Sequence, residues 1–163
     1  MANQMETLPS QRGWPAAAPN RSGAYLLLLS LPAPVEAQIG RLRQIAFAPG
    51  LYGYAGSALG PGGLAARLKR HAAGAGRRHW HIDYLLPHAH LLGALTREDP
   101  QRLECLWASW ASGRALTCIR GFGSSDCACP GHLFFFGPDI NATQFIERAR
   151  RELAADWYAG ATA

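Results

Sequence analysis

The pattern of hydrophobic and polar positions divides the chain into segments with the two-residue period of a strand and segments with the roughly 3.6-residue period of a helix. An almost unbroken apolar run over residues 24–31 predicts a strand that is buried on both faces. Alternation, or a short apolar run, predicts further strands over residues 51–57, 79–84, 91–96 and 133–136. In the second of these strands the alternation places Tyr52, Tyr54 and Gly56 on one face.

Apolar residues at helical spacing predict four helices between these strands, and Gly or Pro signals separate the segments. The first spans residues 34–46, and the second spans residues 64–72, with Arg67 and His71 on one side. In the third, Asp99 is the expected cap and the core face is Leu103, Leu106, Trp107 and Trp110. The last begins near Asn141 and has the core face Phe145, Ala149, Leu153 and Trp157.

The two ends of the chain differ from its centre. Residues 1–22 mix Pro, Ala, Gln and Asn without periodicity, so we expect a disordered leader there. We expect one domain over residues 23–137 and a C-terminal helix packed on it within residues 138–163. There is no pattern of a signal peptide or of a membrane span, and we expect a cytoplasmic protein with reduced cysteines.

Positive charge is concentrated in one part of the chain. Sixteen Lys and Arg residues face 11 Asp and Glu residues, and the pI of about 9.4 favours an anionic partner, nucleic acid first. Residues 62–83 hold five basic residues and one acid, which accounts for +4 of the net charge of +5. A solvated basic face is the ordinary alternative. The candidate nucleic-acid contacts are Lys69, Arg70, Arg77, Arg78, His79 and His81.

Four short islands combine the side chains that phosphodiester hydrolysis requires. They are Gly23-Ala24-Tyr25, Tyr54-Ala55-Gly56, Arg67 with His71, and Glu104. Such a reaction needs the phosphate charge neutralised, a metal held by oxygen and a water deprotonated. Taken singly, each has a structural alternative: a packed tyrosine, a basic helix face or a glutamate paired with an arginine.

In this order the islands resemble the GIY-YIG nuclease family. Strings at residues 51–58, 79–85, 104–105, 121–129 and 132–133 resemble its Uri-superfamily endonuclease branch, so the similarity covers residues 23–136. The segment 34–46 is an insertion relative to most of the family, and both central motif residues are Ala. The late asparagine of many members has no clear counterpart, although Ser124, Ser125 or Asp126 could substitute.

The resemblance implies an α+β fold with a small central antiparallel sheet, three-stranded or slightly larger, flanked by helices. It implies one Mg²⁺ (or Mn²⁺) on Glu104 and neutralisation of the scissile phosphate by Arg67. Tyr25 or Tyr54 would hold and deprotonate the attacking water, and His71 could receive the proton. We favour Tyr25 as the base and Tyr54 as the orienting group, although a phenol near pKa 10 needs a nearby cation for this role.

Two clusters could bind a further metal. Cys127, Cys129 and His132 have a spacing that can ligate zinc, and Cys105 or Cys118 could complete the four ligands. Buried free cysteines are the alternative. The alternating His79 and His81 could bind zinc, line a phosphate path or be ordinary surface histidines.

Three functions are compatible with the sequence. The first is a metal-dependent endonuclease acting on DNA, with single-stranded or branched DNA ahead of duplex and Trp80 stacking on a base. The second is a nucleic-acid-binding module without catalysis, and the third is a zinc-stabilised interaction protein. Retention of Tyr25, Tyr54, Arg67, His71 and Glu104 favours the first.

Overall fold

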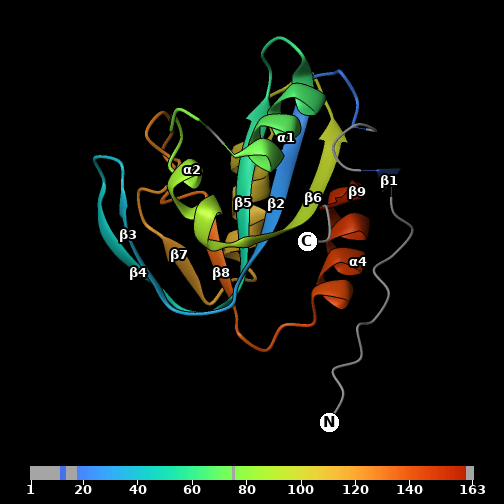
Figure 1. The fold of residues 1–163 in the computed structure, drawn as a ribbon. Helices are drawn as coiled ribbons and strands as arrows, with labels where there is room; N and C mark the ends of the chain where they lie inside the picture. Colours follow the sequence, from blue (N-terminus) through green and yellow to red (C-terminus); the bar gives the residue numbers. More distant parts are fainter. Residues whose placement is uncertain (1–11, 14–17, 75, 161–163) are drawn as a thin grey trace.

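A seven-stranded sheet forms the centre of the molecule in a computed structural model that describes residues 12–13, 18–74 and 76–160 (Figure 1). Neighbouring strands are antiparallel except for the parallel pair β1 and β9. The expected α+β class with an antiparallel sheet is confirmed, and the sheet is larger than expected. Across the sheet the strands are β1 (Arg12–Gly13), β9 (Asp156–Ala159), β6 (His90–Glu98), β2 (Gly23–Leu31), β5 (Gly50–Ala58), β8 (Leu133–Gly137) and β7 (Thr117–Ile119).

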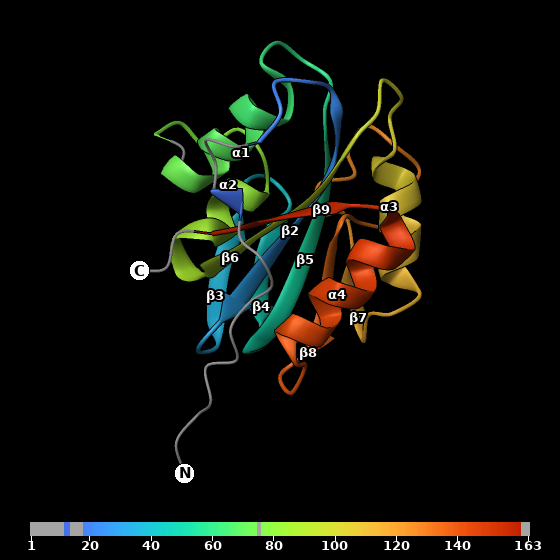
Figure 2. The same cartoon turned by 90° about the vertical axis from the view of Figure 1, so that its right-hand side faces the viewer.

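Both faces of the sheet are covered. Helices α1 (Gly63–Ala73) and α2 (Ile82–Leu85), followed by the short 3₁₀ helix η1 (Leu86–His88), lie on one side (Figure 2). Helices α3 (Glu104–Ser112) and α4 (Ala142–Leu153) lie on the other.

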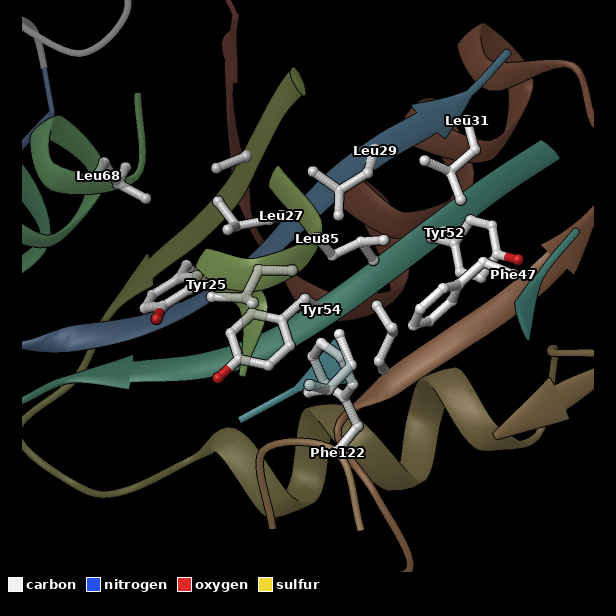
Figure 3. Packing of buried hydrophobic residues seen from close by; sticks show 14 of the residues in the cluster. Tyr25, Leu27, Leu29, Leu31, Phe47, Tyr52, Tyr54, Leu68, Leu85 and Phe122 are labelled. Carbon is white, nitrogen blue, oxygen red and sulfur yellow. The ribbon is translucent and has the colours of Figure 1, made fainter. Parts of the chain in front are cut away.

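The central strand β2 supplies side chains to both of the cores that result. Tyr25, Leu27 and Leu29 point into the core below α1 and α2, and Figure 3 shows Tyr25 beside Tyr54. Ala24, Leu26 and Leu28 point into the core below α3 and α4. The predicted burial of this strand on both faces is therefore confirmed.

The helix predicted over residues 34–46 is wrong. The segment forms a two-stranded hairpin of β3 (Val35–Ile39) and β4 (Arg43–Phe47). Its buried residues, Ala37, Ile39, Ile45 and Phe47, follow a period of two and join the core on the α1 side. Gly40, at φ +50°, supplies the turn that a helix would not contain.

The strand predicted over residues 79–84 is also wrong. The carboxylate of Asp83 accepts hydrogen bonds from the backbone N–H groups of His79 and Trp80 at 2.8 and 2.9 Å. These bonds fold the segment into a turn that leads directly into α2. A buried side chain that bonds to its own backbone favours a turn over an extended strand.

The third predicted helix exists, but it begins later and faces a different way. Asp99 accepts a hydrogen bond from the Gln101 N–H instead of capping the helix, and α3 begins at Glu104. Leu106, expected in the core, is 63% exposed. The buried face consists of Glu104, Trp107, Ala108 and Ala111, so the carboxylate of interest is on the core stripe itself.

The chain ends contribute to the sheet. Asn141 caps α4 by accepting the Gln144 N–H, as predicted, but Trp157 lies in β9 instead of the helix. Of the expected disordered leader, Arg12–Gly13 pairs with β9, and Pro19 and Arg21 accept hydrogen bonds from the start of α1. Residues 1–11 and 14–17 lie outside the described part. No helix of the described residues is long and apolar enough to cross a membrane.

Candidate active site

A polar cleft of about 350 Å³ opens at one end of β2 and β5. It collects side chains from β2, β5, α1, α3 and the loop before β8, which are distant in sequence. Four of the five predicted catalytic residues line it, namely Tyr25, Tyr54, Arg67 and Glu104. Its lining is Tyr25, Tyr54, Gly56, Ser57, Leu59, Gly60, Arg67, Trp80, Arg102, Glu104, Gly123 and Asp126.

The register of the two central strands brings the phenols together. Tyr25 pairs with Gly56, and Leu27 pairs with Tyr54, so the tyrosines are diagonal neighbours on the same face. Both rings point the same way in Figure 3. Gly56 is required because a Cβ at this position would overlap the Tyr25 ring and its hydroxyl.

Tyr25 is held by His71 from the neighbouring helix. The distance from the Tyr25 hydroxyl to His71 Nε2 is 3.1 Å, in a buried environment. Burial raises the pKa of Tyr25 to about 12, although the guanidinium of Arg67 opposes this, and burial also raises the pKa of Tyr54 well above its usual value. Burial lowers the pKa of His71 to about 3, so this imidazole is neutral at pH 7.

Two arginines of α1 contact the indole of Trp80 in different circumstances. The guanidinium carbons of Arg67 and Arg70 lie 4.2 and 3.8 Å from the centre of the ring. Arg70 also forms an ion pair at 2.9 Å with Asp83, whose side chain is 1% exposed. Arg70 therefore has a structural role beside the cleft. No carboxylate among the described residues pairs with Arg67, which leaves its charge available in the cleft. Because both arginines pack on Trp80, its ring holds them in place.

Glu104 is joined to a second carboxylate through an arginine. Arg102 Nε lies 2.6 Å from Glu104 Oε1, and another nitrogen of the same guanidinium lies 2.6 Å from Asp126 Oδ2. The ion pair with Arg102 lowers the pKa of Asp126. Sequence reasoning did not identify Arg102, and it included Asp126 only as one of three substitutes for a missing asparagine. Arg102 lies two residues before Glu104 in the sequence, and this spacing alone does not identify Arg102 as a site residue.

The other predicted nucleic-acid contacts divide into two groups. Lys69, Arg77, Arg78 and His79 are exposed, and a hollow of about 730 Å³ lined by Arg70, Arg77 and His79 shares Trp80 with the cleft. His81 is oriented inward instead. Its Nδ1 accepts a hydrogen bond from the Gly123 N–H at 2.9 Å, so it fastens the loop before β8.

Three cysteines and a histidine form a separate cluster next to the cleft. One ligand atom from each of Cys105, Cys127, Cys129 and His132 lies within 4.8 Å of all the others. Burial, reinforced by the neighbouring thiols, raises the pKa of Cys105 to about 12, and burial lowers the pKa of His132. Cys118 is outside the group.

A test of the packing at Gly56 has a matched control. We expect Gly56→Ala to lower the free energy of unfolding by about 1–3 kcal/mol, because the added methyl overlaps the Tyr25 ring. Gly60→Ala in the same cleft should change it little, since a Cβ there meets nothing within 4 Å. Urea unfolding of both variants measures this. Equal effects of the two substitutions would contradict the close approach of the Tyr25 ring to Gly56.

The fold and cleft define a mixed α+β protein with a polar cleft at the end of its central strands. The chain belongs to the DUF123 family, described as a domain of unknown function, whose model matches residues 24–155. No curated protein and no solved structure was found to match it.

Proposed function

We propose that this protein is a metal-dependent endonuclease of the GIY-YIG type, in the Uri-superfamily branch, which hydrolyses phosphodiester bonds of DNA. The observation that carries the proposal is the meeting of Tyr25, Tyr54, Arg67 and Glu104 in one cleft, from four separate elements. The convergence of the four side chains, more than any one of them, supports the proposal. Two phenols, a guanidinium and a buried carboxylate form the set that the sequence resemblance implies.

Arg67 is the side chain that would bind the scissile phosphate. It lines the cleft, packs on Trp80 and has no paired carboxylate among the described residues. A guanidinium donates charge-assisted hydrogen bonds to phosphate oxygens and stabilises the charge that develops on them. The exposed Arg77 and His79 beside the adjoining hollow would contact the flanking backbone.

Tyr25 would accept the proton of the attacking water. Tyr25 would act as a phenolate whose own proton has passed to solvent. As the water oxygen bonds to phosphorus, the phosphorus–oxygen bond to the leaving group breaks, the water proton moves to the Tyr25 oxygen, and the leaving oxygen takes a proton from solvent. The raised pKa of Tyr25 means that positive charge in the cleft must first favour the phenolate. His71, with a pKa of about 3, is a weak proton acceptor, so we assign it the role of fixing the phenol.

The residues that would hold a divalent cation are Glu104 and Asp126. Two carboxylates are the oxygen donors that Mg²⁺ and Mn²⁺ prefer, and the guanidinium of Arg102 stands between them as an internal cation. The Arg102 side chain is 51% exposed, so it can turn toward solvent when the carboxylates bind a metal. A bound Mg²⁺ supplies positive charge for the phosphate oxygens and lowers the pKa of a coordinated water.

Single-stranded or branched DNA is the proposed substrate. The site is a cleft with an adjoining basic hollow, which suits a flexible strand that can bend into it. Arg67 and Arg70 pack on the Trp80 ring, which leaves less of it for stacking on a base. We therefore expect DNA binding to depend more on contacts to phosphates than on base stacking. A cytoplasmic location accords with four cysteines that form no disulfide among the described residues.

The experiment that tests the function compares cleavage of labelled single-stranded DNA in Mg²⁺ by wild type, Tyr25→Phe and Tyr54→Phe. We expect wild-type cleavage, a loss of about a hundredfold without the Tyr25 hydroxyl and roughly tenfold without the Tyr54 hydroxyl. DNA binding should change little, because Arg67 and the exposed basic side chains, and not the phenols, are the proposed contacts to phosphate. Equal, near-normal rates for both variants would eliminate the phenol as a base.

One observation favours a second candidate, a nucleic-acid-binding module without catalysis. Arg102 already neutralises both carboxylates that would hold the metal. If that bridge persists in solution, Arg67 and the exposed basic side chains beside the cleft would bind phosphate without hydrolysing it. In that case Arg102→Ala would generate Mg²⁺-dependent cleavage that wild type lacks, whereas the nuclease proposal requires wild-type cleavage.

A further inference from the structure

We propose that Cys105, Cys127, Cys129 and His132 bind one structural zinc ion. Their ligand atoms all lie within 4.8 Å of one another, although they come from α3 and from the loop between β7 and β8. Three thiolates and an imidazole form a common tetrahedral zinc set. The sequence left the choice between Cys105 and Cys118 open, and the structure assigns Cys105.

The distances fit a tetrahedral ion. Zinc bonds of about 2.3 Å to sulfur and 2.0 Å to nitrogen separate sulfur from nitrogen by about 3.5 Å, and two sulfurs by about 3.8 Å. The distance between Cys127 Sγ and His132 Nε2 is 3.4 Å. The limit of 4.8 Å for the other pairs is about 1 Å longer than the tetrahedral separation, so binding one ion would draw the four side chains closer together.

The backbone positions the ligands before any metal binds. His132 is 1% exposed, its N–H donates to the Phe122 carbonyl, and its own carbonyl accepts the Ala55 N–H of β5. Gly121 donates to the Pro130 carbonyl, which closes the loop that carries two of the cysteines. A loop of this length without regular structure is uncommon in a compact domain, and a metal crosslink to α3 stabilises it.

The zinc site lies next to both carboxylates of the cleft. Glu104 directly precedes Cys105 in the chain, and Asp126 directly precedes Cys127. Tying the two cysteines to one ion fixes the first turn of α3 against the loop, and with it the separation of the two carboxylates. This positioning role rests on the proposed nuclease function, whereas the zinc site itself does not.

The test is metal analysis of tag-free protein purified with a reductant and without chelator. We expect one zinc per chain in wild type and in Cys118→Ser, and only a trace in Cys105→Ser and Cys127→Ser. Cys118 is a matched control, because it is a half-buried free cysteine bordering the same small cavity as Cys105 and Cys129. Zinc content is measured without any assay of cleavage, so the result tests the zinc site independently of the nuclease proposal.

Cobalt keeps the proposal testable if the cysteine variants fail to fold. Reduced, zinc-free wild type titrated with Co²⁺ should develop the visible absorption of a tetrahedral cobalt–thiolate site, saturating at one equivalent. Trace zinc together with no such absorption would overturn the proposal. Loss of zinc from Cys118→Ser as complete as from Cys105→Ser would overturn the ligand assignment.

The positioning role has its own readout. Zinc-free wild type should need a higher Mg²⁺ concentration for half-maximal cleavage while its affinity for DNA stays unchanged, and added zinc should restore the original value. General unfolding would weaken both together. An unchanged Mg²⁺ requirement would overturn the positioning role and leave the zinc site intact.

Discussion

Glu104→Gln is expected to reduce DNA cleavage at least a thousandfold while DNA binding stays close to that of wild type. Glu104 is 7% exposed and lines the cleft that contains both phenols. Glutamine keeps the size of the side chain and can still accept a hydrogen bond from Arg102, but it loses the charge that would hold the proposed divalent cation. Loss of about 4 kcal/mol of transition-state stabilisation corresponds to this factor.

Glu98→Gln provides the matched control for this prediction. Glu98 lies at the end of β6, its side chain is 50% exposed, and it pairs with Arg21 at 3.8 Å, outside the cleft. The same chemical change there should leave cleavage unchanged. Single-turnover rates and DNA affinities of the two variants make the comparison. Comparable rates in Glu104→Gln and Glu98→Gln would show that Glu104 is not the metal ligand.

The second large effect concerns stability at acid pH. The pKa of His71 is about 3 in the folded protein, because burial disfavours its charged form, and an unfolded histidine titrates near 6.5. Between these values the unfolded state binds a proton that the folded state does not. Stability is therefore fully present above pH 6.5 and is lost as the pH falls toward 3. The loss from His71 is on the order of 3 kcal/mol between pH 7 and 4.

His71→Gln removes this titration and keeps a polar group opposite Tyr25. We expect its free energy of unfolding to fall less steeply than that of wild type between pH 7 and 4, measured by urea unfolding. The carboxylates titrate in both proteins and cancel in the comparison. His88→Gln, at an exposed histidine of η1, should retain the wild-type slope. Parallel slopes for wild type and His71→Gln would mean that His71 is not held neutral.

The apolar run of β2 has no polar face, so the sequence predicted a strand buried on both faces, although the same pattern also fits a buried helix. The hairpin of β3 and β4 was not predicted, because Val35 and Ile39 are four residues apart and fit a helix as well as a strand. The alternation over residues 79–84 was misleading because the polar partner that bends it, Asp83, is itself buried.

The site shows the same division between local and long-range information. The four islands carry enough local pattern to nominate both tyrosines, Arg67 and Glu104. The pairing of Glu104 with Asp126 through Arg102 joins residues more than twenty positions apart, and no local pattern encodes it. The choice of Cys105 over Cys118 likewise depends on how α3 packs against the loop. The sequence therefore predicts the types of side chain at the site, whereas the contacts between them depend on tertiary packing.

We propose that this cleft cuts DNA with a divalent metal. The most direct test incubates wild type with labelled single-stranded, duplex and flap DNA in Mg²⁺, in Mn²⁺ or in EDTA. We expect cleavage with either metal and none in EDTA, fastest on the single-stranded or flap DNA. Binding without cleavage on every substrate and with every metal would contradict the claim, and would leave a basic module that holds nucleic acid without cutting it.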